Sequence, residues 1–221
     1  MFNNDYIGIY DNALNGEECR LILKRFESID KHRHVRPDPS CSAEHMVEKS
    51  KDASFVVDIP LKFSKICTQI NFNLNNKEDN FYHRLVEYAI YKSLLKYQKR
   101  YPFLQYGTTC GKFNITKKYN IQKYEEGEGF YPLHCEHGSL GPYRMLVWML
   151  YLNNAKSGTE FPTQNKVVKP KTGRMVIWPA GWTHPHKGVT PNRGLKYIVT
   201  GWWNYEPKFE GGDLFLYDLD K

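Results

Sequence analysis

The sequence has few of the features that hold secreted or membrane proteins together. Its cysteines form no CxxC pair, and their odd number and scattered spacing do not describe a disulfide framework. No segment reaches the ~18 apolar residues that a membrane helix requires, and the N-terminus shows no basic region followed by an apolar run. These absences predict a soluble protein of a reducing compartment, the cytoplasm.

The chain also lacks internal repeats and low-complexity tracts, and we interpret residues 1–221 as one domain. Hydrophobic residues at 41% and aromatic residues at 15% supply enough apolar mass for a packed core. A formal net charge of +7 favours an anionic partner, which could be nucleic acid, an acidic protein or a small dicarboxylate. Charge alone does not choose among these partners.

The N-terminal part of the chain has helical periodicity. Asn15 can cap a helix over residues 17–29, where apolar side chains recur on one face. Apolar residues at helical spacing predict a second helix over residues 63–70 and a third over residues 81–97. We therefore interpret residues 1–105 as a helical support region.

After Pro102 the pattern changes to short runs of β-branched and aromatic residues between glycines. The predicted strands are residues 108–115, 119–124, 129–134, 144–152, 167–170, 173–179 and 196–203. So many short strands predict a sandwich or barrel over residues 106–205. Residues 206–221 are expected to form a tail that is either packed over the body or mobile.

One short motif suits a metal ion. His134 and Glu136 are two residues apart, so on a strand both side chains would project from the same face. A second histidine from a distant segment would complete a triad of two histidines and one carboxylate, which leaves positions open on iron(II). His184 and His186 are both candidates for that third ligand. Taken alone, however, a His-x-Glu pair is weak evidence for a metal site.

Lys196 lies ten residues beyond His186, at the start of an apolar run. Strand geometry could direct its ammonium group inward, where a buried cation requires an anion. The alternative is a surface lysine that begins a strand. A purely structural metal site needs no such cation, so this residue distinguishes an enzyme from a cupin-like barrel that holds a structural or transport metal.

Taken together and in order, these motifs resemble the 2-oxoglutarate- and iron(II)-dependent dioxygenase superfamily. Within it they are similar to the prolyl 4-hydroxylase-like branch, which includes members from phage genomes. The similarity covers about residues 111–203, and the matching segments are residues 122–130, 134–136, 149–153, 158–161, 168–173, 186–188 and 194–196.

The resemblance implies a fold and a set of site residues. The fold is a double-stranded β-helix, a mainly β, jelly-roll-like, cupin-type barrel with N-terminal supporting helices. The implied iron(II) ligands are His134, Glu136 and His186. Lys196 is the implied anchor of 2-oxoglutarate, and Tyr124 is a supporting hydrogen-bond donor to the same molecule. Glu136 stands where the family usually has Asp. Its longer side chain should change the geometry of the metal site without abolishing metal binding.

The reaction that the resemblance implies is hydroxylation of a substrate C–H bond, and the carboxylate ligand argues against halogenation. Dioxygen and 2-oxoglutarate would be cosubstrates, succinate and carbon dioxide would be coproducts, and ascorbate could support turnover. The first candidate substrate is a prolyl side chain of a peptide or protein, with a free amino acid, another small metabolite or a nucleobase as alternatives. A phage-encoded member would act in the host cytoplasm.

Two non-catalytic alternatives stay open from the sequence. One is the cupin-like metal-binding barrel, and the other is a basic nucleic-acid-binding module, whose binding would depend strongly on salt. No membrane partner is expected, and the sequence does not predict an oligomeric state.

Overall fold

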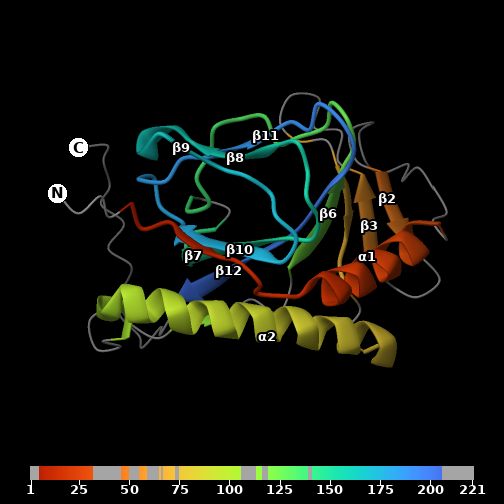
Figure 1. Cartoon of the computed structure of the whole chain (residues 1–221), viewed down its shortest axis with the longest axis horizontal. Coiled ribbons are helices and arrows are strands. Elements are labelled where there is room, and N and C mark those ends of the chain that lie inside the picture. The colour runs from red at the N-terminus through yellow and green to blue at the C-terminus, as the bar shows by residue number, and fades with distance from the viewer. Residues whose placement is uncertain are drawn as a thin grey trace, which may run out of the picture.

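The computed structural model describes residues 5–31, 46–49, 55–58, 65, 67–72, 75–105, 113–115, 119–138 and 141–205. Two antiparallel sheets and two long helices make up this part of the chain (Figure 1). The larger sheet has the strand order β1 (Gly8–Tyr10), β10 (Arg174–Pro179), β7 (Arg144–Tyr151), β12 (Lys196–Tyr205), β6 (Asn120–Tyr124), β4 (Thr68–Ile70), β3 (Phe55–Asp58) and β2 (Met46–Lys49), and β5 (Phe113–Ile115) pairs with β12. The smaller sheet has the order β11 (Lys187–Val189), β8 (Gly158–Phe161) and β9 (Lys166–Val168).

The layers explain where a site can form. In Figure 1 the helices α1 (Gly16–Lys31) and α2 (Lys77–Arg100) run along one side of the larger sheet, and the smaller sheet lies across its other side. Short 3-10 helices span Pro102–Gln105 and Pro162–Gln164. The architecture is the predicted double-stranded β-helix with N-terminal supporting helices, and the space between the two sheets is available for a pocket.

The two helices begin where the sequence indicates. At the start of α1, the Asn15 side chain accepts a hydrogen bond from the Glu18 amide at 2.9 Å, and the Glu18 carboxylate accepts one from the Asn15 amide at 2.7 Å. This reciprocal capping box satisfies amide groups that a helix leaves unpaired. A buried ion pair of Arg25 Nε with Asp79 Oδ1 at 2.7 Å then joins α1 to α2. The predicted first and third helices are therefore confirmed.

The predicted second helix is wrong where the structure describes it. Residues 68–70 form strand β4, which pairs with β6, and residues 63 and 66 of that prediction lie outside the described residues. Cys67 and Ile70 are both buried, but they belong to different cores on opposite faces of the sheet. A strand that is covered on both faces buries residues three apart just as a helix does, and the spacing alone therefore suggested a helix.

Strand β7 carries both hydrophobic cores. Trp148 and Leu150 pack in the core that includes the helices, whereas Val147 and Tyr151 pack in the core between the two sheets. Strand β10 alternates in the same way, with Ile177 in the first core and Trp178 in the second. The apolar run over residues 144–152 therefore forms the central, doubly buried strand that was predicted.

Other strands differ from the prediction in detail. The stretch 129–134 forms only isolated bridges, at Phe130 and His134, instead of a continuous strand. Strands β1, β8 and β11 were not predicted, because they are three or four residues long and carry little of the β-branched pattern. The supposed helical support region also supplies β1 to β4 to the larger sheet, and residues 206–221 lie outside the described residues. None of the described helices is apolar over a length that would cross a bilayer.

Candidate metal centre and its pocket

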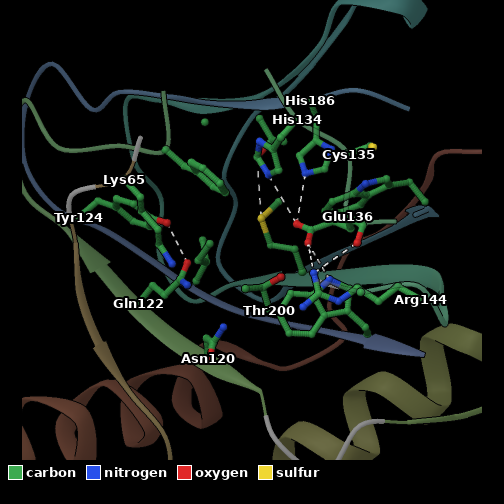
Figure 2. Close-up of a pocket in the computed structure, with 18 of the residues that line it drawn as sticks. Lys65, Asn120, Gln122, Tyr124, His134, Cys135, Glu136, Arg144, His186 and Thr200 are labelled. Carbon is green, nitrogen blue, oxygen red and sulfur yellow. Dashed lines mark hydrogen bonds and ion pairs between the residues drawn. The ribbon is translucent and has the colours of Figure 1, made fainter. Parts of the chain in front are cut away.

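A pocket of about 630 Å³ lies between the two sheets (Figure 2). Strands β6, β7 and β12 supply much of its lining, and the segments 130–138 and 186–188 supply most of the rest. One end of the pocket carries two histidines and a carboxylate, and another part of its wall carries lysines, amides and a tyrosine. The pocket is thus lined by chemically different groups from distant parts of the chain.

The predicted triad comes together in the structure. The candidate ligand atoms of His134, Glu136 and His186 all lie within 4.8 Å of one another. The Glu136 Oε1 atom is 3.6 Å from His134 Nε2 and 3.7 Å from His186 Nε2. Two nitrogens and one oxygen that converge on one point suit a ferrous ion and leave further coordination positions open.

Backbone pairing positions this triad. His134 and His186 form an isolated antiparallel bridge, with amide-to-carbonyl distances of 3.0 and 2.8 Å. Glu136 is fixed separately, because its amide donates to the Ala180 carbonyl at 3.0 Å. The side chains of His134 and Glu136 therefore converge as predicted, although the regular strand expected to carry both is absent.

The backbone also sets which imidazole nitrogen faces the centre. The Nδ1 atom of His134 is 2.9 Å from the Pro132 carbonyl oxygen, and that of His186 is 3.1 Å from the His184 carbonyl oxygen. A carbonyl accepts only, so each Nδ1 carries the proton in the neutral ring and each Nε2 presents its lone pair. The protein itself therefore sets the orientation and tautomer that each ring would need to bind a metal.

The two carboxylate oxygens of Glu136 have different partners. Its Oε2 atom accepts hydrogen bonds from Arg144 Nη1 at 2.8 Å and from Trp202 Nε1 at 3.0 Å. The Arg144 guanidinium in turn stacks 3.8 Å from the centre of a Trp202 ring. Burial alone would raise the pKa of Glu136, but when both histidines are protonated their hydrogen bonds and charges outweigh burial and hold it well below its usual value. Oε1 of the ionised carboxylate stays directed at the two histidines.

Lys196 is buried in the pocket wall, with 3% of its surface exposed. Its ammonium nitrogen is 3.4 Å from the Val189 carbonyl oxygen and 4.6 Å from the centre of the Tyr124 ring. Burial lowers its pKa to about 8, because the charged form loses hydration that no carboxylate in the described part of the chain replaces. The expectation that strand geometry directs this ammonium inward agrees with its burial.

Tyr124 belongs to a hydrogen-bonded chain of polar side chains. Its hydroxyl donates to Gln122 Oε1 at 2.8 Å, and Gln122 Nε2 donates to Gln69 Oε1 at 2.8 Å. The same Gln69 oxygen accepts from Lys65 Nζ at 3.0 Å, and Gln69 Nε2 donates to Asn120 Oδ1 at 3.1 Å. Asn120, Gln122 and Tyr124 alternate along β6, and this period of two was the signal in the sequence that could have revealed the wall.

The structure also decides between neighbouring candidates. Both ring nitrogens of His184 are engaged, by the Asp5 carbonyl at 2.8 Å and the Thr183 hydroxyl at 2.9 Å, so His186 is the histidine in the triad. Cys135, which lies between His134 and Glu136 in sequence, also lines the pocket. Sequence reasoning missed Lys65 and Arg144, because neither stands in a recognisable motif.

Comparison with known proteins gives a family match for the part of the chain that carries the site. Residues 119–204 match the model of the 2OG-Fe(II) oxygenase superfamily. No sequence among curated proteins matches the chain. The matched residues contain all five residues that were predicted to bind metal or 2-oxoglutarate.

Solved structures of prolyl hydroxylases share the fold at low sequence identity. A viral collagen prolyl hydroxylase from Paramecium bursaria chlorella virus 1, in complex with 2OG, is 16% identical with a TM-score of 0.60, over 92% of this chain and 98% of that chain. A Pseudomonas putida prolyl-4-hydroxylase is 14% identical with a TM-score of 0.59, over 91% and 93%. A Trichoplax adhaerens prolyl hydroxylase, in complex with a hypoxia inducible factor peptide fragment, is 16% identical with a TM-score of 0.61, over 91% and 84%.

Residues 119–204 therefore match a 2OG-Fe(II) oxygenase domain, and the fold of the chain is like that of prolyl 4-hydroxylases. This match favours a 2-oxoglutarate- and iron(II)-dependent dioxygenase over the non-catalytic alternatives that the sequence left open.

Proposed function

We propose that His134, Glu136 and His186 bind Fe(II), and that Lys196 and Tyr124 bind 2-oxoglutarate. The single observation that carries this proposal is the convergence of the three ligand atoms within 4.8 Å, with both imidazoles already oriented by backbone carbonyls. Donor atoms of this kind fit ferrous iron, and the positions left open would accept a bidentate oxo-acid and dioxygen. The buried ammonium of Lys196 fits the distal carboxylate.

When bound, the iron and 2-oxoglutarate supply the oxidising power, with succinate and carbon dioxide as coproducts. The protein orients the reactants and excludes water. Arg144 and Trp202 keep one oxygen of Glu136 away from the metal, so that the carboxylate binds through the other oxygen. Lys196 would bind the distal carboxylate of the cosubstrate. Trp178 and Phe161 pack around His186 and shield its ring from water.

The substrate that we propose first is a prolyl side chain of a peptide or protein. The shared fold with prolyl hydroxylases, one of them solved with a peptide fragment, supports this choice. A free amino acid or another small metabolite is the second candidate, because amides and a lysine line much of the wall opposite Arg144, where polar groups of a small molecule could be bound.

An anaerobic titration with Fe(II) and 2-oxoglutarate tests the cofactor assignment. Wild-type protein should develop the weak visible absorption of the iron chelate and release succinate when air is admitted. His186→Ala should abolish both, whereas His184→Ala should retain both, because the backbone carbonyl of His184 contacts the metal-site ring and its side chain does not. A folded wild-type sample with no chelate absorption and no succinate would contradict the proposal.

A further inference from the structure

Lys65 is a second lysine of the pocket that the cofactor assignment leaves without a role. Its backbone forms an isolated bridge with Phe130, and its ammonium lies 5.9 Å from the centre of the Phe130 ring. The same Phe130 ring lies 3.8 Å from the His134 ring, centre to centre. One aromatic ring therefore separates the Lys65 ammonium from the metal triad. Figure 2 shows Lys65 near Tyr124 and across the pocket from Arg144.

The hydrogen bonds of Lys65 do not neutralise its charge. Its Nζ atom donates to the Gln69 amide oxygen at 3.0 Å, and within the described residues no carboxylate forms an ion pair with it. Lys65 is partly buried, and desolvation lowers its pKa because the described residues compensate the charged form only in part. Withdrawing an ammonium from water without a counter-ion costs free energy, so a ligand that supplies an anion is expected to bind there.

The overall charge of the pocket also favours an anionic ligand. The described part of its lining contains three cations, Lys65, Arg144 and Lys196, and one carboxylate, Glu136. A ferrous ion and the 2-oxoglutarate dianion would cancel each other when both bind. Among the described residues a surplus of positive charge would then remain, and an anionic group of the primary substrate would offset it.

The two lysines do not occupy equivalent places. The charge of Glu136 acts on Lys65, where it partly opposes the effect of burial, but it does not contribute at Lys196. Lys65 lies beside Phe130, the ring that packs on His134, whereas Lys196 lies beside Tyr124 and the Val189 carbonyl. A cosubstrate that spans from the metal to Lys196 would leave Lys65 facing the remaining space, next to the amides of Asn120 and Gln122.

We propose that Lys65, assisted by the side-chain amides of Asn120 and Gln122, binds a carboxylate of the primary substrate. The ligand class is a molecule with a carboxylate close to the C–H bond that reacts. That carboxylate can belong to a free amino acid such as proline, or to an acidic side chain beside the acceptor residue of a peptide. The inference rests on the proposed function and specifies the substrate of the same site.

The test compares acid and amide pairs on wild-type protein and on Lys65→Met. The pairs are L-proline with L-prolinamide, and a short prolyl peptide with Asp or with Asn beside the proline. The readout is succinate release above the background without substrate, together with the dissociation constant of 2-oxoglutarate from the anaerobic titration. Lys187→Met is the matched control, because Lys187 is exposed and pairs with Glu160 at 3.3 Å outside the pocket lining.

Wild-type protein should prefer the acid in at least one pair by about tenfold or more, and Lys65→Met should remove that preference. Lys65→Met should bind 2-oxoglutarate within about twofold of wild type, Lys65→Arg should recover part of the preference, and Lys187→Met should behave like wild type. The pair that responds identifies the source of the carboxylate.

Three results would overturn the inference: equal use of acid and amide, no response to any of the four compounds, or a large loss of 2-oxoglutarate affinity in Lys65→Met. The last would place Lys65 in the cosubstrate anchor. Failure of the proposed function is distinguishable from all three, because wild-type protein would then release no succinate from 2-oxoglutarate even without substrate.

Discussion

The two ends of the pocket differ in how completely their polar groups are paired. At the metal end, each imidazole Nδ1 has a carbonyl partner, and the outer oxygen of Glu136 has two donors. At the lysine end, Lys65 Nζ donates to an amide oxygen and Lys196 Nζ to a carbonyl oxygen, and no carboxylate among the described residues pairs with either.

The protein itself orients the groups at the metal end, whereas the lysines at the other end would gain an ionic partner only from a bound ligand. Groups that must be rigid before a metal binds are held by the chain itself, which lowers the cost of binding. Groups that bind anions stay under-compensated, so that an incoming carboxylate restores interactions lost on burial. Four measurements test whether the two ends of the pocket differ in this way.

Lys196→Met removes the cation that is proposed to anchor 2-oxoglutarate. Because truncating one partner of a buried charge pair costs about 2–5 kcal/mol, the affinity for 2-oxoglutarate should fall by roughly 30-fold or more. Metal affinity, measured with Co(II) or Mn(II) alone, should stay near the wild-type value. Loss of metal binding in a folded sample would show that the two ends of the pocket are not independent.

Arg144→Leu removes the cation that holds Glu136 Oε2. Changes to groups that orient a ligand typically weaken metal binding by about 10–100-fold, and we expect a loss in that range by metal titration. Arg174→Leu is the control, because Arg174 pairs with Asp11 away from the pocket. Unchanged metal affinity in Arg144→Leu would mean that Glu136 keeps its position without this partner.

The pH dependence of 2-oxoglutarate binding reports on Lys196, whose pKa is lowered by burial to about 8. The ammonium is the form that binds a carboxylate, so affinity should be maximal below pH 8 and should fall by up to about tenfold per pH unit above it. In Lys196→Arg the decline should disappear, since a guanidinium stays charged. A pH-independent wild-type affinity between pH 7 and 10 would contradict the role of this group.

Trp202→Phe removes one donor to Glu136 but keeps an aromatic ring beside Arg144. A single hydrogen bond to a charged group contributes about 1.5 kcal/mol, so metal affinity should fall by about tenfold or less. The loss should be smaller than that of Arg144→Leu in the same titration. A reversed order would show that the indole, and not the guanidinium, holds the carboxylate.

The triad and the main strands could be predicted from the sequence because their signals are local. The run over residues 144–152 is too apolar for a surface strand, and it became the doubly buried β7. His134 and Glu136 are close in the chain, and the spacing from His186 to Lys196 separated His186 from His184. These inferences needed no knowledge of which strands pair.

The rest of the site depends on contacts between distant segments. Lys65 lies beside a segment whose apolar spacing imitates a helix, and it faces the pocket only because β4 pairs with β6. Arg144 stands at the start of an apolar strand, where a charged residue usually marks a boundary. Its bond to Glu136 joins the start of β7 to a separate segment, which the alternation of a regular strand does not describe.

The hydrogen bond between the His184 ring and the Asp5 carbonyl joins residues that are 179 positions apart. Asp5 immediately precedes the segment leading to β1, which pairs with β10 at the sheet edge, and its side chain forms an ion pair with Lys166. The loop that carries His186 is therefore held by the N-terminal segment of the domain. Because closing a loop this long costs conformational entropy, the candidate metal centre should reach its full order only when the N-terminal segment has docked.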